Sequence, residues 1–212
     1  MARTITEIAT TIKEKNEYLT NKAIYLNAGH TIKNGRGTGA ITKYGDEAIE
    51  ADIFVNDLYE LLKADNLPVI RDDSEWNLTQ EITDVKKFKG IMISFHFNSV
   101  TDKNINGHEI FIPNEYNKLE LILAEGITRI FGKYFNLRGG YKTATKGVKL
   151  ESESYVKKLG ILKATKNDIS ILTEICYISN QKDMETYHKV KDILVKEIAK
   201  WILQFRKEYI IK

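Results

Sequence analysis

The chain has 212 residues, 42% hydrophobic and 29% charged, which predicts one compact domain with a sizeable core. The formal net charge is only +3 and lysine-rich spots alternate with acidic residues, so we expect no nucleic-acid partner. The one cysteine excludes a disulfide within the chain. No stretch approaches the roughly 20 apolar residues of a membrane helix, and we expect no membrane insertion. The first residues lack the apolar core of a signal peptide, which predicts synthesis in the cytoplasm.

The first predicted element is a helix. Residues 3–20 carry apolar side chains at gaps of three, four and seven positions, with charged residues between them. This pattern predicts an N-terminal helical extension, residues 1–22, that docks on the remaining domain, residues 23–212. A partner-binding arm is the alternative.

From residue 23 onward, short apolar runs alternate with helical patterns. The apolar runs predict strands at 23–28, 67–70, 90–97, 107–112, 159–162 and 169–178. The helical spacing predicts helices at 46–64, 116–132 and 181–207. Residues 29–44 and 138–158 are polar and irregular and are expected to be loops, while 72–88 stays unassigned. This order predicts an α/β domain with helices on the faces of a sheet.

Two of the four histidines come late in predicted strands. His30 follows the strand at 23–28, and His96 lies in "SFHFNS" of the strand at 90–97. Ligands of open α/β sheets gather beyond the carboxyl ends of the strands, so these two histidines could share a site. Taken alone, His30 is more typical of a turn, and His96 of a core histidine with its hydrogen bonds satisfied.

A glutamate at the start of the first long helix could join them. Glu47 shares a helix face with Ala51, Phe54 and Leu58 and must point toward the sheet, whereas Glu50 points to one side. A buried carboxylate is costly unless a positive charge such as a metal ion compensates it. Two histidines and a glutamate form a catalytic zinc set with one position left for water. The alternative is an acid favoured by the helix dipole, and the separated spacing leaves both explanations open.

Glu174 is a carboxylate inside the apolar run "ILTEICYI", where an unpaired charge is costly. We interpret it as a general base that takes a proton from water and passes it to a leaving group. An ion pair with a lysine such as Lys163 is the structural alternative. Asn98 shares a strand side with His96 and could orient a ligand or substrate. His108 could support a ligand or face the substrate.

With these residues in view, the sequence resembles the zinc-dependent N-acetylmuramoyl-L-alanine amidases of the amidase_3 type, which include phage endolysins and bacterial cell-wall hydrolases. "LNAGH" is similar to the Gly-His opening of that family, and "ISFHFNS" to its I-S-x-H-x-N signature. "GHEIFI" and "RGG" are similar to its G-x-E strand and its Arg-Gly step, and "LTEICYISNQKD" to its L-x-E-x-x-F-x-S-N-x-x-D ending. The matches follow the family's order from about residue 23 to 205.

The resemblance implies a single domain with a twisted mixed sheet of about six strands flanked by helices. It implies one zinc ion per chain and a catalytic glutamate; the ligands would be His30, Glu47 and His96, and the catalytic residue Glu174. Gly29 would let the chain turn sharply before the first ligand. The substrate-binding residues that we expect are Asn98, His108, Arg138 and Lys163. The first 22 residues have no counterpart, the 139–158 loop is enlarged, and Lys163 stands where an arginine is common.

The function that the resemblance implies is hydrolysis of the amide between N-acetylmuramic acid and L-alanine in peptidoglycan. Because no signal peptide is seen, we expect a phage or prophage endolysin that reaches the cell wall through holin-dependent release. A zinc peptidase or deacetylase of the cell wall is one alternative. A non-catalytic, wall-binding virion component is the other.

Overall fold

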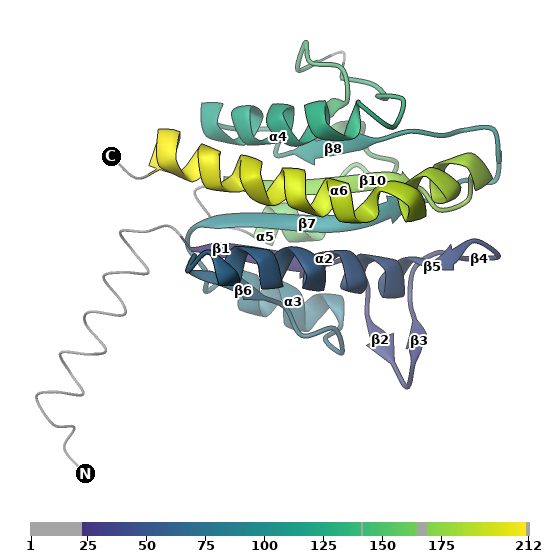
Figure 1. Ribbon diagram of the computed structural model, residues 1–212, viewed down its shortest axis with the longest axis horizontal. Coiled ribbons are helices and arrows are strands. Elements are labelled where there is room, and N and C mark those ends of the chain that lie inside the picture. The colour runs from purple at the N-terminus through teal and green to yellow at the C-terminus, as the bar shows by residue number, and fades with distance from the viewer. Residues whose placement is uncertain (1–22, 141, 165–168, 211–212) are drawn as a thin grey trace, which may run out of the picture.

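The computed structural model describes residues 23–140, 142–164 and 169–210, where one mixed sheet forms the centre of the fold (Figure 1). Its strand order is β6-β1-β7-β10-β8-β9, and every pair of neighbours is parallel except β8 and β10. The six strands are β1 Ile24–Ala28, β6 Val69–Arg71, β7 Ile91–Asn98, β8 Glu109–Ile112, β9 Val148–Leu150 and β10 Ile169–Tyr177. The predicted mixed sheet of six strands is confirmed. The predicted N-terminal helix lies outside the described residues.

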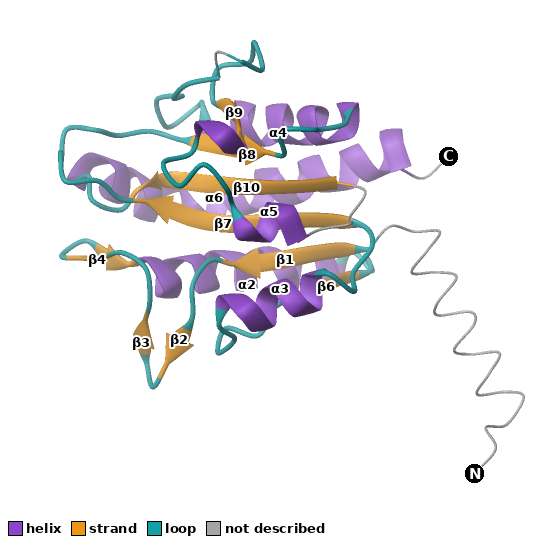
Figure 2. Ribbon diagram, turned by 180° about the vertical axis from the view of Figure 1, so that it is seen from behind, coloured by secondary structure: helices purple, strands orange, loops and turns teal. Residues whose placement is uncertain are grey.

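Helices cover the two faces of the sheet unequally. Three long helices lie on one face: α2 Glu47–Ala64, α4 Lys118–Phe131 and α6 Gln181–Phe205 (Figure 1). A π-helical turn, Arg206–Ile210, extends the last of them. Two short helices, α3 Leu78–Val85 and α5 Gly160–Ala164, lie on the other face (Figure 2). Among the described helices, none is both long and apolar enough to span a membrane.

The prediction of a strand at 159–162 is wrong, because α5 begins at Gly160. A four-residue apolar run does not distinguish a buried strand from a short buried helix. Ile161 and Leu162 bury their side chains against the sheet in either conformation. The unassigned segment 72–88 contains α3, whose start carries a capping box formed by Asn77 and Gln80.

The two segments predicted as loops contain short regular elements. Residues 29–44 hold most of two small hairpins, formed by β2 Ile32–Lys33 with β3 Arg36–Gly37 and by β4 Ile41–Thr42 with β5 Gly45–Asp46. The segment 138–158 contains β9 and a 3-10 turn, Glu151–Glu153. Such two- and three-residue pairings are too short to show a hydrophobic periodicity, so they are not predicted from the residue pattern.

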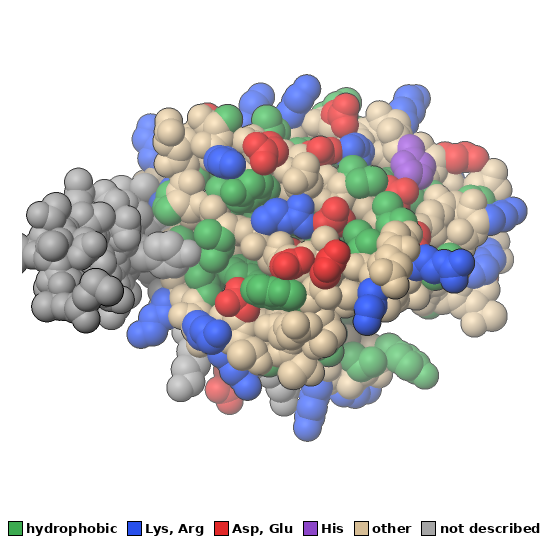
Figure 3. Space-filling view, turned by 90° about the horizontal axis from the view of Figure 1, so that it is seen from below, with side chains coloured by type: hydrophobic (Ala, Val, Ile, Leu, Met, Phe, Trp, Pro, Cys, Tyr) green, Lys and Arg blue, Asp and Glu red, His purple; other side chains and the backbone are tan. Residues whose placement is uncertain are grey.

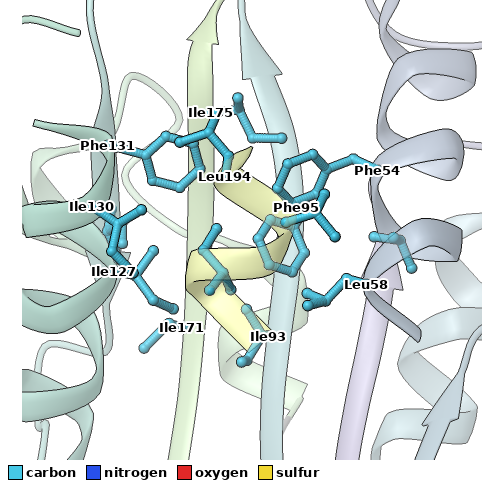
Figure 4. Close-up of a cluster of buried hydrophobic side chains, with 14 of the residues drawn as sticks. Phe54, Leu58, Ile93, Phe95, Ile127, Ile130, Phe131, Ile171, Ile175 and Leu194 are labelled. Atoms are coloured by element: carbon cyan, nitrogen blue, oxygen red, sulfur yellow. The ribbon is translucent and has the colours of Figure 1, made fainter. Parts of the chain in front are cut away.

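The main core lies between the sheet and the three long helices. Figure 4 shows its centre, where side chains from five elements meet: Phe54 and Leu58 of α2, Ile93 and Phe95 of β7, Ile171 and Ile175 of β10, Ile127, Ile130 and Phe131 of α4, and Leu194 of α6. A smaller cluster, including Tyr25, Met92 and Leu172, lies on the opposite face under α3 and α5. Lys and Arg side chains are interspersed with Asp and Glu over the surface seen in Figure 3.

Gly126 determines how closely α4 approaches α6. A Cβ atom at this position would overlap the indole of Trp201, whose Nε1 donates a hydrogen bond to the Leu123 carbonyl over 3.2 Å. Close packing of the two helices at this point therefore requires a residue without a side chain.

We expect Gly126→Ala to lower the free energy of unfolding by about 1–2 kcal/mol, because overpacking outweighs the gain in helix propensity. Urea unfolding followed by circular dichroism measures the effect. Gly160→Ala in α5 is the matched control, since a Cβ there would meet only the flexible end of Ile82, at 3.3 Å. Equal unfolding midpoints for the two variants would contradict the packing argument.

Candidate active site

The carboxyl-terminal halves of β7 and β10, and the amino end of the antiparallel strand β8, carry polar side chains on one face of the sheet. His96 of β7 is paired in register with Glu174 of β10, which is paired in turn with Glu109 of β8. Cross-strand partners project to the same side, so these three side chains share a face. By alternation it is also the face of Met92 and Leu172, which the short helices α3 and α5 cover.

Three of the predicted residues meet at this edge and could hold a metal ion. The ligand atoms of His30, Glu47 and His96 all lie within 4.8 Å of one another. Glu47 Oε1 is 3.1 Å from His30 Nε2 and 3.3 Å from His96 Nδ1. Two ligand atoms bound tetrahedrally at the usual zinc distances lie about 3.4 Å apart, so the donor types and their spacing fit such an ion.

Glu47 is held by backbone groups from both sides. Its Oε1 accepts a hydrogen bond from the Phe97 N–H over 3.1 Å, and its Oε2 accepts one from the Ala40 N–H over 2.9 Å. Burial alone would raise the pKa of Glu47, but hydrogen bonds from His30 and His96 outweigh burial and lower it. The Oε1 of Glu50, by contrast, lies 3.9 Å from His188 Nε2. Glu47 therefore lies beside the two histidines, as the helix-face argument predicts.

We expected Gly29 to provide the sharp turn before His30, and the structure shows a different role for this glycine. His30 itself has the left-handed backbone conformation, with φ 71°, and Gly29 does not. Gly29 is required for space, because a Cβ atom there would overlap the imidazole of His96. Gly39 makes a second close approach, and a Cβ on it would lie 2.6 Å from His30 and 2.8 Å from Glu47. Both glycines thus allow the backbone to pass directly against the ligand side chains.

Glu174 lies beside the three-residue cluster and is paired in register with His96. Its Oε2 is buried and has no hydrogen-bond partner among the described residues. Burial raises the pKa of Glu174 well above its usual range, and the charges of Glu47 and Glu109 raise it further, while Lys149 opposes them. The alternative of an ion pair with Lys163 is untested, because the Lys163 side chain lies outside the described part.

A second polar cluster next to Glu174 contains two residues that the sequence reasoning missed. Glu109 accepts a hydrogen bond from Asn98 Nδ2 over 2.7 Å and forms an ion pair with Lys149. Lys149 also lies over the Phe111 ring, with its Nζ 5.6 Å from the ring centroid. The available signal was the buried acid in "HEIFI", an anomaly of the same kind as Glu174.

Two further substrate-binding candidates, Arg138 and His108, contact residues outside the cluster of His30, Glu47 and His96. The guanidinium of Arg138 is 5.4 Å from the centre of the Tyr177 ring and donates to the Asn106 carbonyl over 3.4 Å. His108 is fully buried and stacks on Phe131, with a centroid distance of 4.2 Å. The structure therefore contradicts a substrate-facing His108, whose ring belongs to the packing between β8 and α4.

With added Zn²⁺ as the probe of the candidate metal site, we expect Gly29→Ala to weaken binding roughly tenfold or more relative to the wild-type chain, because the added methyl group displaces the His96 ring. Equilibrium dialysis followed by metal analysis measures the affinity. Gly45→Ala is the control, since its Cβ would meet the flexible side chains of Glu50, at 3.2 Å, and Met184, at 3.4 Å. Unchanged binding by the Gly29 variant would show that the site tolerates this displacement.

We expect His108→Leu to reduce the loss of stability in acid. Burial lowers the pKa of His108 from 6.5 to about 3. The unfolded chain therefore takes up a proton at this residue below pH 6.5, whereas the folded chain does so only near pH 3. Its contribution to stability is complete above pH 6.5 and is lost as the pH falls from there toward 3. Urea midpoints between pH 7 and 4, with a chelator present, should fall less steeply in the variant, while the exposed His188→Gln control should keep the wild-type slope.

The comparisons with known proteins agree with this geometry. The family model described as Amidase_3, N-acetylmuramoyl-L-alanine amidase, matches residues 24–204. A sequence search of curated proteins found no significant match.

Solved structures share the fold at low sequence identity. The catalytic domain of the CD27L endolysin targeting Clostridia difficile has a TM-score of 0.66 and 20% identity, covering 86% of this chain and 97% of that one. An N-acetylmuramoyl-L-alanine amidase from Clostridium difficile 630 has a TM-score of 0.68 and 16% identity, covering 90% and 99%. The catalytic domain of the amidase CwlV from Bacillus (Paenibacillus) polymyxa has a TM-score of 0.66 and 19% identity, covering 87% and 97%. From its family match over residues 24–204, the chain belongs to the N-acetylmuramoyl-L-alanine amidases of the Amidase_3 type.

Proposed function

We propose that the protein is a zinc-dependent hydrolase that cleaves the amide between N-acetylmuramic acid and L-alanine in peptidoglycan. Membership of the family supports hydrolysis of peptidoglycan amides. The observation that carries the finer proposal is the position of Glu174, whose buried Oε2 has no hydrogen-bond partner among the described residues and whose register partner on the neighbouring strand is His96.

His30, Glu47 and His96 would hold the ion, because they supply two imidazole nitrogens and one carboxylate oxygen within 4.8 Å of one another. This set leaves a coordination position free for water or substrate. A zinc ion bound there would act as a Lewis acid, polarising a carbonyl group and lowering the pKa of water.

Glu174 would move the proton. As a carboxylate it accepts the proton of the attacking water, and as a carboxylic acid it delivers that proton to the departing amine nitrogen of L-alanine. Both forms must be accessible during turnover. The neutral form is favoured by burial and by the charges of Glu47 and Glu109, and the charged form by Lys149.

The proposed biological role is that of an endolysin. The chain would be made in the cytoplasm and would reach the cell wall through holin-dependent release. The structural likeness to the CD27L endolysin catalytic domain supports this role at the level of the fold. In that setting Asn98 and Arg138 stay candidates for substrate contact, together with the untested Lys163.

We expect Glu174→Gln to lower the release of new amino-terminal L-alanine from purified sacculi by roughly 100-fold or more, because glutamine cannot transfer the proton. Labelling of free amino groups, followed by mass spectrometry of the fragments, measures the reaction. Glu185→Gln, at an exposed position in α6, is the control. Newly freed amino groups on residues other than L-alanine would indicate a peptidase, and loss of acetyl groups a deacetylase. Sacculi that the wild-type chain leaves uncleaved would indicate a non-catalytic, wall-binding virion component.

A further inference from the structure

A buried polar network lies behind the turn that carries His30. Asn27 and Ser94 are fully buried and Asp72 is 5% exposed. The Ser94 hydroxyl donates to Asn27 Oδ1 over 2.5 Å, and Asn27 Nδ2 donates to Asp72 Oδ2 over 2.6 Å. Polar groups removed from water are costly unless they are paired, so a connected network of this kind specifies one arrangement of the chain.

Asp72 continues the hydrogen bonding of β6 beyond the end of that strand. The backbone pairing of β1 with β6 ends at Leu26 and Arg71. The Asp72 N–H then donates to the Leu26 carbonyl over 3.1 Å, and the Asp72 carboxylate accepts the Ala28 N–H over 2.9 Å. A side chain thus replaces the next backbone acceptor, and the last residue of β1 stays fixed although β6 has ended.

The residue after Ala28 is held from the opposite side. The Gly29 N–H donates to the Phe95 carbonyl of β7 over 2.8 Å. His30 follows directly, with φ 71°, a conformation that a residue other than glycine adopts only where its surroundings impose it. The two anchors therefore select the backbone conformation in which the imidazole of His30 reaches Glu47.

We propose that Asp72 is a positioning residue for the metal site. Through the Asn27 amide and the Ala28 N–H it fixes the end of β1, and the fixed turn presents His30 Nε2 to the ion. The effect on metal affinity rests on the proposed function, whereas the anchoring of the turn is a property of the metal-free chain. The two parts can therefore be tested separately.

The discriminating variants are Asp72→Ala and Asp72→Asn. Both donors use the same carboxylate oxygen, Oδ2, so asparagine can place its carbonyl oxygen there and keep both bonds, whereas alanine removes both. In competition with a chromophoric chelator, we expect the Zn²⁺ affinity to fall about tenfold or more for alanine and less than about threefold for asparagine. In the metal-free proteins, hydrogen exchange of the Ala28 and Gly29 amides should accelerate for alanine alone.

Ile127→Ala is the matched control, because Ile127 is fully buried in α4 under the opposite face of the sheet. It should lower the unfolding midpoint and leave both readouts unchanged. If Asp72→Ala does not fold, Asn27→Val removes the amide link to Asp72 together with the Ser94 hydrogen bond, leaves the Ala28 N–H bond to Asp72, and should change both readouts in the same direction.

Two results would overturn the positioning role. One is wild-type zinc affinity and wild-type amide exchange in Asp72→Ala. The other is an equal change of both readouts in Ile127→Ala. Failure of the wild-type chain to bind Zn²⁺ would instead refute the zinc centre of the proposed function, and exchange at Ala28 and Gly29 would still decide the role of Asp72.

Discussion

The burial of the Glu47 carboxylate is the constraint on which the rest of the site depends. A charge in this position is costly unless several partners compensate it, and four groups do so here: two imidazoles and two backbone N–H groups. These partners come from the turn after β1, from the residue before β4, and from β7. Placing one carboxylate therefore fixes the start of α2 against the sheet and orients both histidines toward a common point.

The unequal cover on the sheet explains why a site can exist at this place. Three long helices bury one face, and their packing supplies most of the core. The other face has only α3 and α5. There the apolar positions Tyr25, Met92 and Leu172 are followed along their strands by Asn27, His96 and Glu174. Toward the carboxyl ends of these strands, the side chains on this face thus change from buried apolar ones to polar ones. Ligands of open α/β sheets bind at that end of the strands.

Part of the site could be predicted because two of its residues, Glu47 and Glu174, break a local pattern. Glu174 interrupts an apolar strand, and Glu47 lies on the apolar face of an amphipathic helix, so both were recognisable from periodicity. Asn27, Glu109 and Lys149 were missed, although Asn27 and Glu109 also interrupt apolar strands. Lys149 carried no such signal, because a lysine in a polar segment is ordinary until its partner is known. The opposite error occurred at His108, whose polar ring suggested function but whose stacking on Phe131 is a packing contact.

The sequence by itself determined the α/β class, the long helices, the central strands and the residue types available for a metal. These follow from hydrophobic period and from the cost of burying charge, both of which are local properties of the chain. Only the tertiary structure decided that His30, Glu47 and His96 converge, that His30 and not Gly29 takes the left-handed conformation, and that Asp72 anchors the turn. Those features depend on contacts between segments 17 to 66 positions apart, where register and the space beside a glycine decide the outcome.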